Sequence, residues 1–107
     1  MQIRGPKTWD EYLDLVHQAV YEVDELKACL VEEDELEDAA LYNQFLGPLD
    51  IELRKLFDAM TSGAYQYPTG QDLGFMPLVQ KYGRFMPMRG LLETINKTHR
   101  DGLVEAH

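Results

Sequence analysis

Hydrophobic residues in the first third of the chain recur at the spacing of one helix face. From Trp9 onward the apolar side chains return every three or four residues, at Trp9, Tyr12, Leu13, Val16, Val20, Val23 and Leu30. This period of about 3.6 residues indicates an amphipathic α-helix. Thr8 and Glu11 have the spacing of a capping box, in which each side chain bonds the backbone amide of the other. The pattern therefore predicts a helix over residues 8–31.

The next helical pattern is interrupted by a glycine and a proline. Asp34 is a suitable N-cap, and acidic residues follow it in the first turn, where the helix dipole favours negative charge. Pro48 has no N–H to donate to the carbonyl four residues earlier, so we expect either a kink or a new helix at that point. The two apolar stripes predict helices over 34–46 and 48–62, or one kinked helix, with Gly63 as the stop.

The second half of the chain alternates a long irregular segment with short helical patterns. Residues 63–74 contain several glycines and one proline and show no period, which predicts a loop, and connections of this length are often functional. Phe-Met-Pro then occurs twice, at 75–77 and 85–87. Proline suits the first position of a helix, so we expect a short helix over 77–83 and a last helix over 87–102.

No stretch shows the strict alternation of a strand, so the predicted class is all-α. We expect an irregular bundle of about four helices plus one short helix, forming a single domain over residues 1–107. The ends, 1–7 and 103–107, are expected to be flexible. The first helix, about 35 Å long, exceeds the length that so small a domain favours, which suggests hairpin packing or self-association.

Charge is unevenly distributed along the chain. The net charge is -9, and residues 1–62 hold five Lys or Arg against 15 Asp or Glu, whereas residues 63–107 hold five against four. An acidic surface repels phosphate, and no basic stripe is interleaved with aromatics, so we expect neither nucleic acid nor a membrane as partner. The chain begins without the apolar stretch of a signal peptide, so we expect a cytoplasmic protein.

Candidate catalytic residues lack suitable neighbours in the sequence. Cys29 lies within one helical turn of three glutamates, which disfavour the reactive thiolate. His99 falls on the apolar stripe of the last helix and is a possible general base, but an imidazole in a last turn also interacts favourably with the helix C-terminus. Sequence spacing assigns His99 no partner, and no phosphate-binding glycine motif is present. We therefore expect no enzyme and no cofactor.

A metal site is the alternative functional reading. Asp14 precedes His17 by one helical turn, and Asp10, Tyr21 and Asp24 share the same side of the first helix. Dimetal helical bundles use two Glu-x-x-His pairs and further carboxylates that project inward, whereas this chain has one Asp-x-x-His pair on an outward face. We expect a solvated helix surface and no metal ligands. A metal- or small-ligand-binding bundle based on His17 remains the alternative function.

The strongest candidate for a functional site is the segment 75–89. It combines methionines, aromatic residues and arginines and contains no acidic residue, a composition typical of interface cores. The predicted partner-binding residues are Phe75, Met76, Tyr82, Arg84, Phe85, Met86, Met88 and Arg89. Because two prolines and a glycine interrupt the segment, we expect some of its apolar side chains to stay exposed; the other possibility is a lid folded onto the bundle. The preferred function is a non-enzymatic protein-interaction or regulatory module that docks a protein partner or a second copy.

Overall fold

The computed structural model describes residues 5–32, 39–67 and 69–103, and within these ranges the fold contains helices and no strand. In chain order the elements are α1 (Trp9–Glu32), α2 (Ala39–Ser62), α3 (Met76–Tyr82), the 3-10 turn η1 (Gly83–Phe85) and α4 (Arg89–Asp101). The predicted all-α class is confirmed. No helix in these ranges is long and apolar enough to cross a membrane.

Helix α1 begins at the predicted capping box. The hydroxyl oxygen of Thr8 accepts a bond of 3.1 Å from the Glu11 amide, and Glu11 Oε2 accepts one of 3.1 Å from the Thr8 amide. These reciprocal bonds satisfy amides that the first turn leaves without helical partners. The buried side of the helix carries Tyr12, Val16, Ala19 and Val23. The predicted range of 8–31 is therefore correct to within one residue at each end.

Helix α2 runs without interruption through Pro48, so of the two alternatives the single helix is correct. Its buried stripe continues across the proline and comprises Phe45, Leu46, Leu49, Leu53, Leu56 and Met60. Pro48 and Gln44 are both exposed, so water can hydrate the Gln44 carbonyl that receives no bond from Pro48. The helix ends where Gly63 adopts a positive φ of 80°, as predicted. The predicted start at Asp34 lies outside the described residues.

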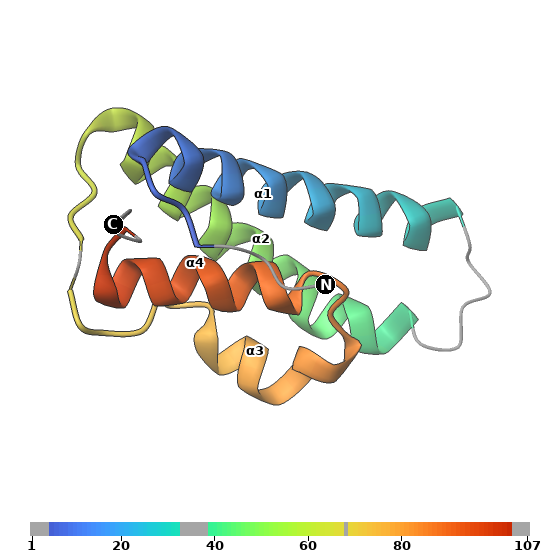
Figure 1. Ribbon diagram of the computed structural model, residues 1–107. Helices are drawn as coiled ribbons and strands as arrows, with labels where there is room; N and C mark the ends of the chain where they lie inside the picture. The colour runs from blue at the N-terminus through green and yellow to red at the C-terminus, as the bar shows by residue number, and fades with distance from the viewer. Residues whose placement is uncertain (1–4, 33–38, 68, 104–107) are drawn as a thin grey trace.

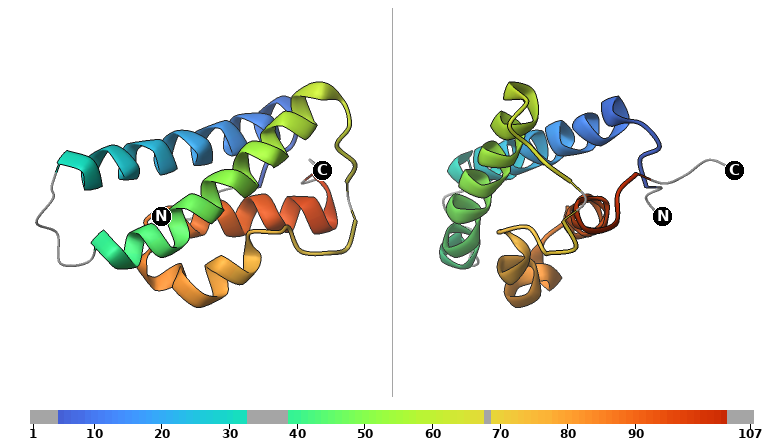
Figure 2. Two further views of the ribbon diagram at one scale, coloured as in Figure 1. Left: turned by 180° about the vertical axis from the view of Figure 1, so that it is seen from behind. Right: turned by 90° about the vertical axis from the view of Figure 1, so that its left-hand side faces the viewer.

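The helices form two layers around one core. Figure 1 shows α1 and α2 running in opposite directions, with α4 alongside α1 and α3 beneath α4. From behind, α2 crosses diagonally over α1 and α4, and the end-on view places α3 below α4 and beside the lower part of α2 (Figure 2). The long first helix is thus accommodated by hairpin packing against α2.

An ion-pair network fixes α1 against α2 on the outer side of the hairpin. Arg54 donates to Asp24 on α1 at 2.9 Å and to Asp50 on its own helix at 2.9 Å, while Lys27 donates to Asp50 at 2.9 Å. Burial by itself raises the pKa of Asp50, but the hydrogen bonds and charges of Lys27 and Arg54 outweigh this and leave the pKa below its ordinary value. Asp50 is therefore ionised throughout the neutral range.

The two Phe-Met-Pro repeats play different structural roles. Pro77 lies in the first turn of α3, close to its predicted position. Pro87 instead lies in a turn, and α4 begins two residues later at Arg89 with Met88 as N-cap. The last helix is therefore shorter than the predicted range of 87–102. It ends where Gly102 takes a φ of 94°, the predicted stop.

Candidate functional site

Part of the predicted interaction segment belongs to the core. Phe75 is 1% exposed, Met86 5% and Met88 2%, so the prediction that these side chains form a contact surface is wrong for this structure. Phe75 precedes α3, whereas Met86 and Met88 follow η1. The turn at η1 folds the second half of the segment back, and both ends reach the same core. Segment 75–89, here called the lid, therefore covers the core with its apolar side.

The remaining apolar residues of the segment lie at the edge of the lid. Met76, Tyr82 and Phe85 are partly buried and pack against the core. Tyr82 stacks on Phe45 of α2, with ring centroids 5.3 Å apart, and its hydroxyl donates to Gln44 at 3.3 Å. These contacts tie α3 to α2, and the three side chains remain partly exposed.

The outward side of the segment is basic. Lys81, Arg84 and Arg89 are exposed, and together they line a hollow of about 270 Å³, here called the basic hollow, formed by Val79, Gln80, Lys81, Gly83, Arg84 and Arg89. A side chain at Gly83 would meet Arg89 at 3.2 Å, so the glycine allows Arg89 to lie against the backbone. Glu93 accepts from Arg89 Nε at 2.6 Å. The arginine is thus held from two sides.

Sequence reasoning identified Arg84 and Arg89 but left Lys81 and Gln80 out of the site. A signal for Lys81 was present, because the chain has no acidic residue between Asp72 and Glu93. This signal indicates that the segment is basic, but it does not show which of its side chains point outward and which point into the core. Only the path of η1 shows that the three cations share one hollow while the methionines at 86 and 88 turn inward.

A second hollow of opposite charge adjoins this segment. It measures about 290 Å³, is here called the acidic hollow, and is lined by Glu22, Glu25, Leu26, Cys29, Pro87 and Met88. Its walls come from α1 and from the connection between η1 and α4, which are far apart in sequence. Sequence periodicity places the glutamates on the polar face of α1 but gives no sign of this pairing. Cys29 is exposed here.

The long loop is held against the end of α4 through His99. The Tyr65 hydroxyl lies 2.6 Å from His99 Nδ1, and Thr69 Oγ1 lies 3.1 Å from His99 Nε2. The Tyr65 hydroxyl also lies 2.6 Å from the Tyr12 hydroxyl. The amides of Thr69 and Gly70 donate to the last carbonyls of α4, at 3.0 and 3.2 Å. The partner that sequence spacing could not assign to His99 is therefore the loop itself.

The protonation states of this cluster favour a structural role. Burial lowers the pKa of His99, and the charge of Asp72 offsets only part of that effect. Burial also raises the pKa of Tyr65 to about 12 and that of Tyr12 above its ordinary range. At neutral pH the phenols stay protonated, Tyr65 donates to the neutral imidazole, and Nε2–H donates to Thr69. A tyrosine with a raised pKa is a poor nucleophile. The hydrogen bond between Tyr65 and His99 therefore fits a role in holding the loop against α4 better than a role in catalysis.

Acidification is expected to weaken the folded state through His99. Since its pKa is lower in the folded state than the ordinary 6.5, the unfolded chain takes up a proton first, and the free energy of unfolding falls as the pH drops below about 6.5. Urea titrations at pH 7.5 and 5.5 test this. His99→Gln should show a smaller loss than the wild type. His17→Gln, which changes an exposed imidazole, should retain the wild-type loss; equal losses in all three proteins would contradict the assignment.

The alternative metal site is not assembled in this structure. His17 is exposed and stacks on Phe57, with ring centroids 5.6 Å apart. Asp24, one of the carboxylates on its side of α1, is bonded to Arg54 through both oxygens. Over the described ranges, no three His, Cys, Asp or Glu side chains are grouped so that they could hold a metal ion.

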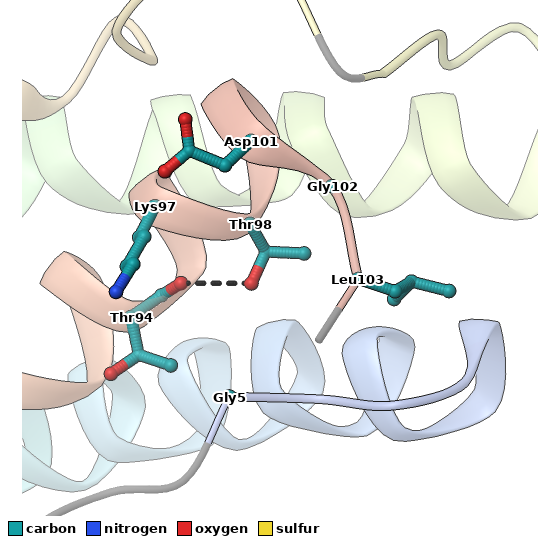
Figure 3. A pocket seen from close by; sticks show the side chains of 7 residues that line it. All are labelled: Gly5, Thr94, Lys97, Thr98, Asp101, Gly102 and Leu103. Atoms are coloured by element: carbon teal, nitrogen blue, oxygen red, sulfur yellow. Dashed lines mark hydrogen bonds between the residues drawn. The ribbon is translucent and has the colours of Figure 1, made fainter. Parts of the chain in front are cut away.

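A third hollow lies where the N-terminal segment meets the end of α4 (Figure 3). It measures about 270 Å³ and is lined by Gly5, Thr94, Lys97, Thr98, Asp101, Gly102 and Leu103. The Thr98 hydroxyl donates to the Thr94 carbonyl at 3.0 Å within the helix, and Lys97 and Asp101 bring charges of opposite sign. Its polar groups thus do not converge on one kind of ligand, unlike those of the basic hollow.

No protein-family model matches the chain, and neither the curated proteins nor the solved structures contain a significant match. A function therefore has to be inferred from the residues themselves. Among the three hollows, the basic hollow has the most consistent chemistry, since three cations line it and no carboxylate does.

Proposed function

We propose that the chain is a non-enzymatic protein-interaction module that docks a protein partner, or a second copy of itself, through the outer side of segment 75–89. The supporting observation is the basic hollow: three exposed cations gathered on a chain whose net charge is -9. Arginine binds carboxylates through two parallel hydrogen bonds, and charge complementarity sets the orientation and rate of docking. The hollow is suited to an acidic surface on another protein.

The buried side of the segment supports this function by holding the outer side in place. Phe75, Met86 and Met88 anchor the lid in the core, so docking needs little ordering of the backbone, which is one of the costs of association. Met76 and Phe85, at the edge of the lid, supply apolar contact beside the cations. The acidic charge of the rest of the chain disfavours nucleic acid, and the cytoplasmic location expected from the sequence belongs to the same proposal.

Site-specific photo-crosslinking in cells tests the proposed function. A benzophenone amino acid at Gln80, inside the basic hollow, should give a discrete crosslinked product that mass spectrometry can identify. The same group at Thr61, an exposed position on α2 away from the hollow, is the control. Arg84→Glu/Arg89→Glu should reduce the Gln80 product about tenfold, a loss near 1.4 kcal/mol, with an unchanged helical spectrum. Equal products from both positions, or no effect of the charge reversal, would refute the proposal.

A further inference from the structure

We propose that the chain forms a two-fold symmetric dimer in which the basic hollow of each copy receives the acidic hollow of the other. This rests on the proposed function, because it uses the same outer side of segment 75–89, and it names the partner as a second copy. The two hollows adjoin through consecutive residues: Pro87 and Met88 line the acidic one, and Arg89 lines the basic one. Opposite charges therefore flank the same connection between η1 and α4.

Four of the charges that line the two hollows have no ion-pair partner among the described residues, whereas Arg89 is paired with Glu93. Within the described ranges, Lys81 and Arg84 have no carboxylate at ion-pair distance, and Glu22 and Glu25 have no cation there. The adjacent Asp24 differs, because it is exposed and is bound by Arg54 of α2. Glu22 accepts a hydrogen bond from Gln18, and Glu25 bonds the Tyr21 hydroxyl, so both carboxylates keep their charge unpaired. Four unpaired charges of two signs flank the same connection.

Apolar surface accompanies the unpaired charges. Tyr21 on α1 is 60% exposed and lies one helical turn before Glu25, while Leu26 and Met88 are the apolar residues that line the acidic hollow together with Pro87. On the basic side, the Arg84 guanidinium lies over the Phe85 ring, 4.9 Å from its centroid. Interfaces combine aromatic side chains, methionine and arginine in this way. Both surfaces offer hydrophobic contact and charge together.

A surface that carries both signs side by side is complementary to itself under a two-fold rotation. Such a rotation places the Arg84 and Arg89 side of one copy on the Glu22 and Glu25 side of the other, and repeats the contact in reverse. The net charge of -9 opposes association, but charges more than about 8 Å apart are largely screened at physiological salt, whereas close pairs are screened less. The local pairs therefore outweigh the general repulsion.

Sedimentation velocity over a range of micromolar concentrations tests the dimer. The wild type should pass from monomer to dimer as concentration rises, with no larger species, and should dissociate in about 1 M salt, where the screening length is about 3 Å. Arg84→Glu/Arg89→Glu and Glu22→Arg/Glu25→Arg should each stay monomeric at least about tenfold above the wild-type dissociation constant. Mixed in equal amounts, the two variants should form a heterodimer, because both of its contacts then pair opposite charges.

Matched variants separate the contact from net charge and from folding. Lys55→Glu/Lys97→Glu lowers the net charge by as much as Arg84→Glu/Arg89→Glu does, but at exposed positions outside both hollows. It should form more dimer than Arg84→Glu/Arg89→Glu at the same concentration, and its helical spectrum should match that of the wild type. If a reversed variant loses helicity, Arg84→Gln/Arg89→Gln and Glu22→Gln/Glu25→Gln replace the reversals, and each should weaken dimerisation.

Several outcomes would overturn the dimer. A wild type that stays monomeric at every concentration, a wild type that forms open polymers, or reversed variants that remain monomeric when mixed would each exclude it. A monomeric wild type that still gives the Gln80 crosslink to a different protein would leave the proposed function standing and remove only the second copy as its partner. A dimer that gives no Gln80 crosslink between its two copies would show that the basic hollow lies outside the contact, and would exclude the proposed arrangement.

Discussion

Phe75→Ala is expected to lower the free energy of unfolding by about 3–5 kcal/mol, the range for truncating a buried aromatic ring. The ring is 1% exposed and belongs to the same core as Val79 and Leu92. Its removal leaves a cavity at the point where α3 begins, and the lid loses its first anchor. Urea denaturation monitored by circular dichroism gives the difference directly.

Met76→Ala is the matched control, because Met76 is adjacent in sequence but only partly buried. Its cost should stay below about 2 kcal/mol, since less apolar area leaves water on folding. If Phe75→Ala proved silent while Met76→Ala was costly, the segment would be facing the other way, and the buried anchors of the proposed docking surface would be wrong. The comparison thus tests which side of the lid is inward.

The parts of the fold that sequence predicted well are those determined by local interactions. Helix α1 follows from an unbroken apolar period and from the reciprocal bonds of Thr8 and Glu11, and glycines at 63 and 102 end their helices with positive φ. Each signal needs only neighbouring residues. The all-α class followed for the same reason.

The continuity of α2 depended on interactions that the local sequence does not contain. A proline inside a helix costs about 3 kcal/mol, which favours a break at Pro48. The stripe from Phe45 to Met60 stays buried on both sides of the proline, and interrupting the helix would remove half of the stripe from the core. Tertiary packing therefore outweighed the local preference.

The candidate site was located by composition but not oriented by it. The absence of acidic residues and the arginines at 84 and 89 marked the segment that carries the basic hollow. Which side chains turn inward depends on the 3-10 turn at Gly83–Phe85, and the acidic hollow brings Glu22 and Glu25 beside Pro87 across most of the chain. Periodicity within one element cannot show a contact between two elements, so it could not predict the partners of His99 or the approach of Glu22 to Pro87.

Asn96→Ala is expected to cost about 2 kcal/mol and to loosen the end of the long loop. Asn96 is 6% exposed; its Oδ1 accepts from the Leu73 amide at 2.7 Å, and its Nδ2 donates to Asp72 at 3.0 Å. Alanine leaves the Leu73 amide without its partner in a partly buried position, and a stranded buried donor costs about 1–3 kcal/mol. Lys97→Ala, at the next and exposed position, should change stability by less than about 0.5 kcal/mol.

Hydrogen exchange shows where the stability of Asn96→Ala is lost. The amides of Thr69, Gly70 and Leu73 all bond to α4, and they should exchange faster in Asn96→Ala than in the wild type, while the amides of α1 keep their order of protection. Dimer formation should be unaffected, because Asn96 lines neither the basic nor the acidic hollow. Unchanged exchange at all three amides would mean that the Tyr65 and Thr69 contacts of His99 hold the loop without Asn96, and that the buried amide plays no part in positioning it.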